Sequence, residues 1–61
     1  MFFKFYDSII NKNEIQYIML KSLTLYIYFK NKGYTTFEFK NIQAVNNAFD
    51  KIFDILNSKE Q

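Results

Sequence analysis

The chain contains no cysteine, histidine, proline, arginine or tryptophan, and glycine occurs once in 61 residues. The lack of cysteine excludes disulfides, and the lack of cysteine and histidine together removes the side chains that normally bind structural zinc. A chain of this length buries too small a fraction of its surface to be more than marginally stable alone. Self-association is therefore the stabilising device that we expect.

The same absences argue against several kinds of catalytic and cofactor site. Ser8 and Ser22 have no histidine or cysteine to pair with, so nucleophilic catalysis is not expected. The single glycine, Gly33, cannot by itself form a glycine-rich phosphate loop. We therefore expect a protein that is not an enzyme and that uses neither a cofactor nor a metal.

Apolar residues make up 49% of the chain and aromatic residues 21%, which is rich for so small a protein. Some of these side chains must lie on the surface, where an oligomer or a partner would cover them. The abundant Phe, Tyr, Ile, Asn and Lys share A/T-rich codons, so the number of tyrosines and lysines is not in itself a functional signal. The net charge of +2 is spread along the chain and gives a weak electrostatic footprint.

Lysines interrupt the long apolar stretches. Lys4 divides the apolar N-terminal run and no small-residue cleavage site follows it, so no signal peptide is expected. Lys21 and Lys30 interrupt the longest apolar region before it reaches the length of a transmembrane helix, about 20 residues. We expect a cytoplasmic protein without a membrane partner.

Alternation of apolar and polar residues predicts four strands, which span residues 1–6, 14–20, 23–30 and 34–40. Residues 8–10 are interpreted as a kinked end of the first strand, followed by an asparagine-rich turn at residues 11–13. The second strand has an ambiguous phase, and a bulge would let Ile15 and Ile18 both point inward.

A three-residue hairpin loop is predicted at Asn31-Lys32-Gly33, with Gly33 in the left-handed conformation. After the fourth strand, Asn41 is a favourable helix N-cap, and residues 58–61 are predicted to be a frayed tail. Apolar residues at helical spacing form one stripe, which comprises Val45, Ala48, Phe49, Ile52, Phe53 and Leu56. The expected fold is α+β: one domain, residues 1–61, with a four-stranded antiparallel meander and one C-terminal amphipathic helix packed on one face.

Because the helix covers one side of the predicted sheet, the other side stays open. Tyrosines interleaved with lysines on such a face can stack unpaired bases while the ammonium groups meet phosphates. The alternatives are an ordinary sheet surface with favourable cross-strand pairs or a dimer interface, and the absence of arginine weighs against nucleic acid. The residues expected there are Lys4, Tyr6, Tyr26, Tyr28, Lys30, Thr36, Glu38 and Lys40, with Gln16 or Tyr17 as a further member.

Asp50 and Asp54 lie four residues apart and project from the same side of the predicted helix. Such a pair can bind a divalent cation or act in acid–base catalysis, but no third carboxylate is near in sequence. An acidic patch for a partner's basic surface is the better interpretation.

The predicted sheet has two edge strands, and the chain has no proline to block their pairing. A homodimer is therefore expected, either by strand addition along residues 1–6 or through the tyrosine face.

A pattern of hydrophobic and turn residues covers most of the chain. It consists of Asp7-Ser8-Ile9-Ile10-Asn11, then Glu14-Ile15-Gln16-Tyr17-Ile18, then Phe37-Glu38-Phe39 before residues 44–56. This pattern resembles small phage and prophage proteins of the sheet-plus-helix kind, a group that includes compact inhibitors of bacterial defence systems such as anti-CRISPR proteins. The resemblance implies a binder of a host protein, and no functional residue is carried over from that group.

The leading hypothesis is a non-catalytic protein-binding module, a phage or mobile-element inhibitor that occludes a site on a host defence protein. Its expected anchors are Tyr26, Tyr28 and Tyr34 with Lys30 beside them, together with the acidic pair Asp50 and Asp54. One alternative is a single-stranded nucleic-acid-binding protein that uses the tyrosine and lysine face. Another is a sponge for a nucleotide signal, held in a pocket between subunits.

Overall fold

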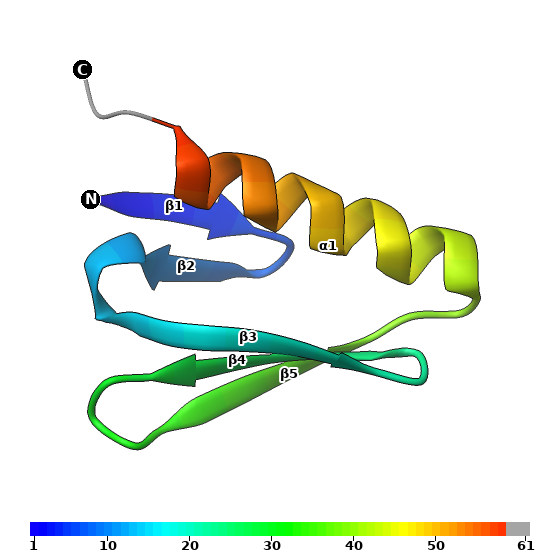
Figure 1. The fold of residues 1–61 in the computed structure, drawn as a ribbon, viewed down its shortest axis with the longest axis horizontal. Coiled ribbons are helices and arrows are strands. Elements are labelled where there is room, and N and C mark those ends of the chain that lie inside the picture. The colour runs from blue at the N-terminus through cyan, green and yellow to red at the C-terminus, as the bar shows by residue number, and fades with distance from the viewer. Residues whose placement is uncertain (59–61) are drawn as a thin grey trace.

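The chain folds into two small antiparallel sheets and one C-terminal helix, as the computed structural model shows for residues 1–58 (Figure 1). The expected α+β class with a helix packed on a sheet is confirmed, but the single four-stranded sheet is wrong. Five strands form a two-stranded sheet, β1-β2, and a three-stranded sheet, β3-β4-β5. The elements are β1 (Phe2–Phe5), β2 (Ser8–Asn11), a 3₁₀ turn (Lys12–Glu14), β3 (Ile15–Lys21), β4 (Thr24–Phe29), β5 (Tyr34–Glu38) and α1 (Ile42–Asn57).

The predicted kink in the first strand is the turn of a separate hairpin. β1 and β2 pair antiparallel from Phe2↔Asn11 to Phe5↔Ser8, so residues 8–10 run back along the first strand instead of extending it. Tyr6 makes this reversal with a φ of 57°, a left-handed angle that is uncommon for a bulky residue. After β2, the Asn11 side chain accepts a hydrogen bond from the Asn13 backbone N–H at 3.1 Å and stabilises the turn into β3.

The three-stranded sheet has the alternation that the sequence predicts. Its register shifts between Ile15 and Tyr17, which is the predicted bulge, and Ile15 and Ile18 both pack against the core. Beyond the bulge, residues of the three strands stand opposite one another in regular rows from Tyr17↔Tyr28 to Lys21↔Thr24 on one side of β4, and from Tyr28↔Tyr34 to Thr24↔Glu38 on the other.

The turn between β4 and β5 differs from the predicted loop in one backbone angle. Lys32 takes the left-handed conformation, with φ at 75°, whereas Gly33 has no positive φ. The Asn31 side-chain oxygen accepts a hydrogen bond from the Gly33 N–H at 2.9 Å, and the Lys32 N–H donates to the Phe29 carbonyl at 3.0 Å. Because these bonds close the turn one residue earlier than expected, the left-handed position falls on the lysine.

Helix α1 begins as predicted, because the Asn41 side chain accepts a hydrogen bond from the Ala44 N–H at 2.8 Å. One prediction about its stripe is wrong: Phe53 lies at the margin and is 62% exposed. The fully buried core lies between the helix and the inner faces of both sheets, and consists of Phe5, Ile10, Leu25, Ile27, Val45, Ala48 and Ile52. Of the predicted tail, residues 59–61 lie outside the described residues.

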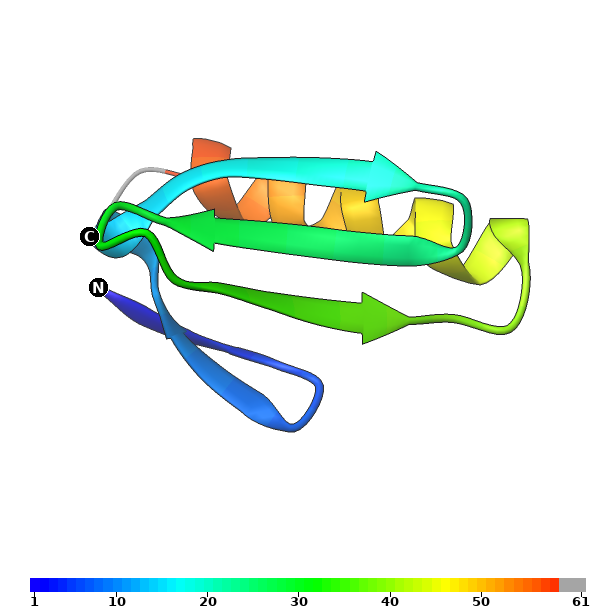
Figure 2. The same ribbon diagram turned by 90° about the horizontal axis from the view of Figure 1, so that it is seen from below.

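The helix covers one face of the three-stranded sheet and leaves the other face open, as predicted (Figure 2). The outer residues of this open face are Tyr17, Met19, Lys21, Thr24, Tyr26, Tyr28, Tyr34, Thr36 and Glu38. Lys4 and Tyr6 were expected there, but both belong to the β1–β2 hairpin, which lies beside β5. Lys40 was also expected there, but it follows the end of β5. Within residues 1–58, no helix combines the length and the apolarity needed to cross a membrane.

Candidate functional site

Three tyrosines form a row across the open face, one from each strand of the larger sheet. Tyr17 of β3 stands opposite Tyr28 of β4, and Tyr28 stands opposite Tyr34 of β5. Directly opposite residues of antiparallel strands project from the same face with neighbouring Cβ atoms, so the three rings meet. We call Tyr17, Tyr28 and Tyr34 the tyrosine row.

The rings of the tyrosine row are stacked face to face. The Tyr17 and Tyr28 centroids lie 4.5 Å apart with ring planes at 11°, and the Tyr28 and Tyr34 centroids lie 5.4 Å apart at 25°. Tyr26 adds a more distant stack on Tyr28, at 6.2 Å and 16°. Because β4 lies between β3 and β5, Tyr28 has a ring on each side. Within the row, the outermost ring faces are those of Tyr17 and Tyr34.

This arrangement changes the chemistry of the central phenol. Partial burial raises the pKa of Tyr28 above its ordinary value of 10.0, and the neighbouring Tyr17, Tyr26 and Tyr34 phenols raise it further, because their phenolates would repel its own. At neutral pH the Tyr28 hydroxyl is therefore protonated and able to donate a hydrogen bond. The row offers a partner aromatic edges that each carry a hydroxyl group.

Apolar contact area on the open face is concentrated around the row. Tyr17 is 51% exposed, Tyr34 62% and Met19 38%. At the far end of the face, Lys21 and Glu38 stand on either side of Thr24. Lys30 was predicted to be an anchor, and the structure places it exposed in the β4–β5 turn, at the end of the sheet where the row lies. The face therefore has an aromatic end and a mixed-charge end.

The predicted acidic patch lies on a different surface. Asp50 and Asp54 are exposed on α1, on the side of the helix that faces away from its buried residues Val45, Ala48 and Ile52. The sheet and the helix therefore separate the two carboxylates from the tyrosine row. The structure brings Tyr26, Tyr28 and Tyr34 together, and it does not bring them together with Asp50 and Asp54.

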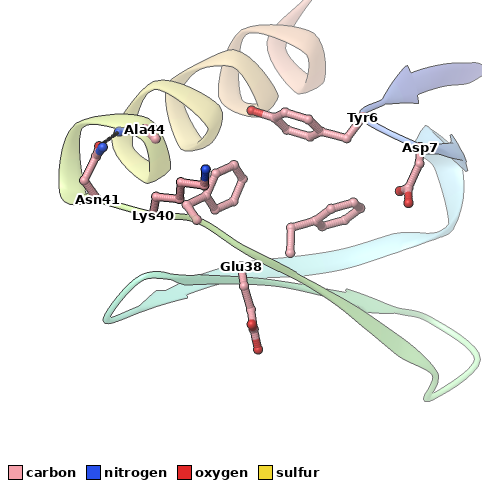
Figure 3. Close-up of a pocket in the computed structure, with 8 residues that line it drawn as sticks. Tyr6, Asp7, Glu38, Lys40, Asn41 and Ala44 are labelled. Carbon is pink, nitrogen blue, oxygen red and sulfur yellow. Dashed lines mark hydrogen bonds between the residues drawn. The ribbon is translucent and has the colours of Figure 1, made fainter.

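A hollow of about 550 Å³ lies beside β5, between the β1–β2 turn and the start of α1 (Figure 3). The Tyr6 ring contacts Phe39 and Phe37 there, with centroids 5.4 and 6.0 Å apart. Glu38 points away from the other lining side chains, and the Asn41 side chain is used as the helix cap. The hollow offers an aromatic floor with Asp7 and Lys40 among its lining residues.

A second, smaller hollow of about 290 Å³ lies between β3 and α1. It is lined mainly by apolar side chains of both elements, with Tyr17 and Lys12 among its other lining residues. We call it the β3–α1 groove. Its apolar residues are Ile15, Ile18, Phe49, Ile52, Phe53 and Leu56.

The sequence prediction missed two prominent residues of these surfaces. The sequence predicts Tyr17 only as an optional member of the open face, because the bulge at Gln16 resets the alternation of β3, yet Tyr17 completes the tyrosine row. Tyr6 was placed on the open face, because strict alternation from Phe3 and Phe5 requires it, but the hairpin turn carries its ring to Phe37 and Phe39. The ambiguous phase of β3 is a sequence signal for the bulge that places Tyr17 on the open face. Nothing in the sequence indicates that Tyr6 takes a left-handed backbone angle.

In the part of the chain that the structure describes, no group of three or more acidic side chains is placed to hold a metal ion together. Comparison with known proteins adds no relative: no protein-family model, no curated protein and no solved structure matches this chain.

Proposed function

We propose that this protein is a non-catalytic binding module that attaches to a partner protein through the open face. The observation that supports this most is the tyrosine row, an exposed aromatic surface on a sheet face that the helix leaves bare. Tyrosine is enriched at the energetically dominant points of protein interfaces, since it combines a large apolar ring with a hydroxyl. Inhibition by occlusion of a site on a larger host protein, as phage-encoded inhibitors do, is the mode of action we propose.

Stacking of the rings lowers the entropy cost of binding a partner. Ordering flexible side chains on binding costs about 0.5–1.5 kcal/mol for each side chain immobilised. The rings of the row already restrain one another in the free protein, with interplanar angles of 11° and 25°. Less rotamer freedom therefore remains to be lost when a partner covers them. A preorganised row of this kind suits a protein surface that accepts ring edges and hydrogen bonds.

The same geometry weakens the nucleic-acid alternative. Base binding on a sheet uses exposed ring faces, and both faces of Tyr28 are covered by Tyr17 and Tyr34. The nucleotide-sponge alternative has the hollow beside β5 as a cavity, but Lys40 is the one cation among the described residues that line it. A phosphate-bearing ligand would find little charge there. We therefore rank both alternatives below protein binding.

The test uses a face variant and a matched surface variant. Tyr17→Ser with Tyr34→Ser removes the two exposed ends of the row, while Phe2→Ser with Ile9→Ser removes two apolar residues that are 67% and 70% exposed on the hairpin. Each immobilised protein is incubated with nuclease-treated lysate of the native host, and retained proteins are quantified by mass spectrometry. We expect a partner that the native protein and the hairpin variant retain and the face variant loses.

A partner retained equally by all three proteins would contradict the proposed use of the open face. A second arm measures fluorescence anisotropy of labelled oligothymidylate with the native protein and the face variant. Tight binding that weakens steeply with salt and is lost in the face variant would replace protein binding with single-stranded nucleic-acid binding.

A further inference from the structure

The two edges of the three-stranded sheet are not equivalent. Beside β5 lies the β1–β2 hairpin (Figure 2). Its Phe5 ring meets the Phe37 ring of β5 edge-on, with 5.0 Å between the centroids. Among residues 1–58, no strand lies beside the outer edge of β3. Alternate backbone N–H and C=O groups of an edge strand point away from its single neighbour and lack a strand partner. β3 therefore presents an unpaired strand edge.

Apolar surface flanks this free edge on both sides of the sheet. On the open face, Tyr17 and Met19 project from β3 itself, 51% and 38% exposed. On the helix side, the β3–α1 groove runs along the same strand, with Phe53 at its margin, 62% exposed. A strand added to β3 would therefore cover apolar side chains above and below the sheet as well as pair backbone groups.

The two ends of this edge carry opposite charges. Glu14 immediately precedes β3 and Lys21 ends it, and both side chains are exposed. Within one chain they lie at opposite ends of a seven-residue strand, roughly 24 Å long at about 3.4 Å per residue, and so do not pair with each other. In an antiparallel arrangement of two such strands, Glu14 of each copy comes near Lys21 of the other. The edge is thus complementary in charge to a second copy of itself.

We propose that a second copy of this chain pairs with the β3 edge, antiparallel and about a two-fold axis near Ile18, to form a six-stranded sheet shared by two protomers. Beyond the bulge, this register places outward-facing residues opposite outward-facing residues, with Tyr17 of one copy opposite Met19 of the other. Both helices therefore lie on one side of the shared sheet and both tyrosine rows on the other. Phe53 and the β3–α1 groove of each protomer then meet their symmetry mates across the axis.

Size favours a second copy as the occupant. A stable interface removes about 800 Å² from each partner, or about a sixth of the 4713 Å² exposed by one chain. The β3 strand runs along the longest dimension of the molecule, which is 33 Å, so an interface along its edge covers much of one long side (Figure 1). Seven side chains form the buried core of residues 1–58, and the chain has no cysteine for a disulfide, so such pairing would add stability. This pairing is independent of the partner proposed for the open face.

The first experiment measures molar mass by light scattering and sedimentation over a wide range of protein concentration. The native chain is expected to have a molar mass twice the 7.4 kDa of one protomer. Phe53→Lys places an ammonium group at the proposed interface twice by symmetry. We expect it to raise the dimer dissociation constant about a hundredfold, since burial of the Phe53 ring contributes strongly to the free energy of association. Circular dichroism of the variant checks that each protomer remains folded.

Two matched variants test rival surfaces. Phe2→Lys makes the same change on the hairpin at 67% exposure, and Tyr34→Lys makes a comparable change at the β5 end of the tyrosine row at 62% exposure. Both are expected to remain dimers. Loss of the dimer in Phe2→Lys or Tyr34→Lys, with retention in Phe53→Lys, would overturn the proposal in favour of the hairpin or the open face.

A charge exchange tests the direction of pairing. Glu14→Lys and Lys21→Glu are each expected to weaken the dimer, about tenfold at low salt, because each places like charges at two symmetric contacts. The double variant keeps the net charge of the chain and is expected to recover native affinity. Additive weakening in the double variant would exclude antiparallel pairing of β3 about this axis, and a native chain that stays monomeric at every concentration would overturn the proposal outright.

Discussion

At the scale of single residues, three turns depend on left-handed backbone angles at residues that are not glycine. Tyr6, Ser22 and Lys32 have φ values of 57°, 57° and 75°. A side chain strains this conformation, by about 1 kcal/mol or more relative to glycine. Each of the three closes a reversal between adjacent strands, so the surrounding strand pairs hold it there.

Lys32→Gly removes this strain at a fully solvated turn. We expect the free energy of unfolding to rise by about 0.5 kcal/mol, because relief of strain exceeds the extra entropy that glycine gives the unfolded chain. Urea unfolding followed by circular dichroism measures the change. Lys30→Gly, in the same turn but without a positive φ, should instead lower stability by a similar amount. Equal effects of the two variants would contradict the assignment of the left-handed position.

The phenol of Tyr28 provides a second prediction at this scale. Its pKa is raised in the folded protein, so between the unfolded value near 10 and the folded value the native state binds more protons than the unfolded state. The free energy of unfolding must therefore fall as pH rises above about 10. Tyr28→Phe should show a weaker fall over the same pH range. Denaturant unfolding at several pH values measures this, and parallel pH profiles for both proteins would contradict it.

At the scale of elements, the start of α1 depends on one side chain. The Asn41 oxygen accepts the Ala44 N–H, which has no partner within the helix. Asn41→Ala should lower the free energy of unfolding by about 1 kcal/mol. Asn46→Ala is the matched control, since Asn46 is an exposed position inside the helix where alanine is a better helix former. Thermal denaturation should show a lower midpoint for Asn41→Ala and an unchanged or higher one for Asn46→Ala.

Long periodic elements could be predicted from the sequence, and short ones could not. Helix α1 and the paired strands β4 and β5 repeat their pattern over enough residues to show it. The four-residue strands β1 and β2 each alternate too briefly to differ from one kinked strand. For the site, a period of two placed Tyr26, Tyr28 and Tyr34 on one face. Tyr17 joined them only through the bulge, whose effect on phase depends on tertiary pairing.

At the scale of the whole molecule, stability depends on few buried side chains. The free energy of unfolding of a 61-residue domain is expected to be about 3–9 kcal/mol. Ile27 of β4 is fully buried, and Ile27→Ala should cost about 2–5 kcal/mol, enough to unfold much of the population. Ile9→Ala makes the same change at 70% exposure and should alter stability by less than about 0.5 kcal/mol. Chemical denaturation compares them, and similar losses would contradict the position of the core.

The tyrosine row also decides how this protein interacts with light. Four of the five tyrosines lie in one set of stacked rings, and the chain has no tryptophan. Ultraviolet absorption near 280 nm and the intrinsic tyrosine emission of the protein therefore originate mainly from one face. A molecule that covers this face changes the surroundings of most of the absorbing rings, so we expect binding there to change the intrinsic tyrosine fluorescence of the unlabelled protein.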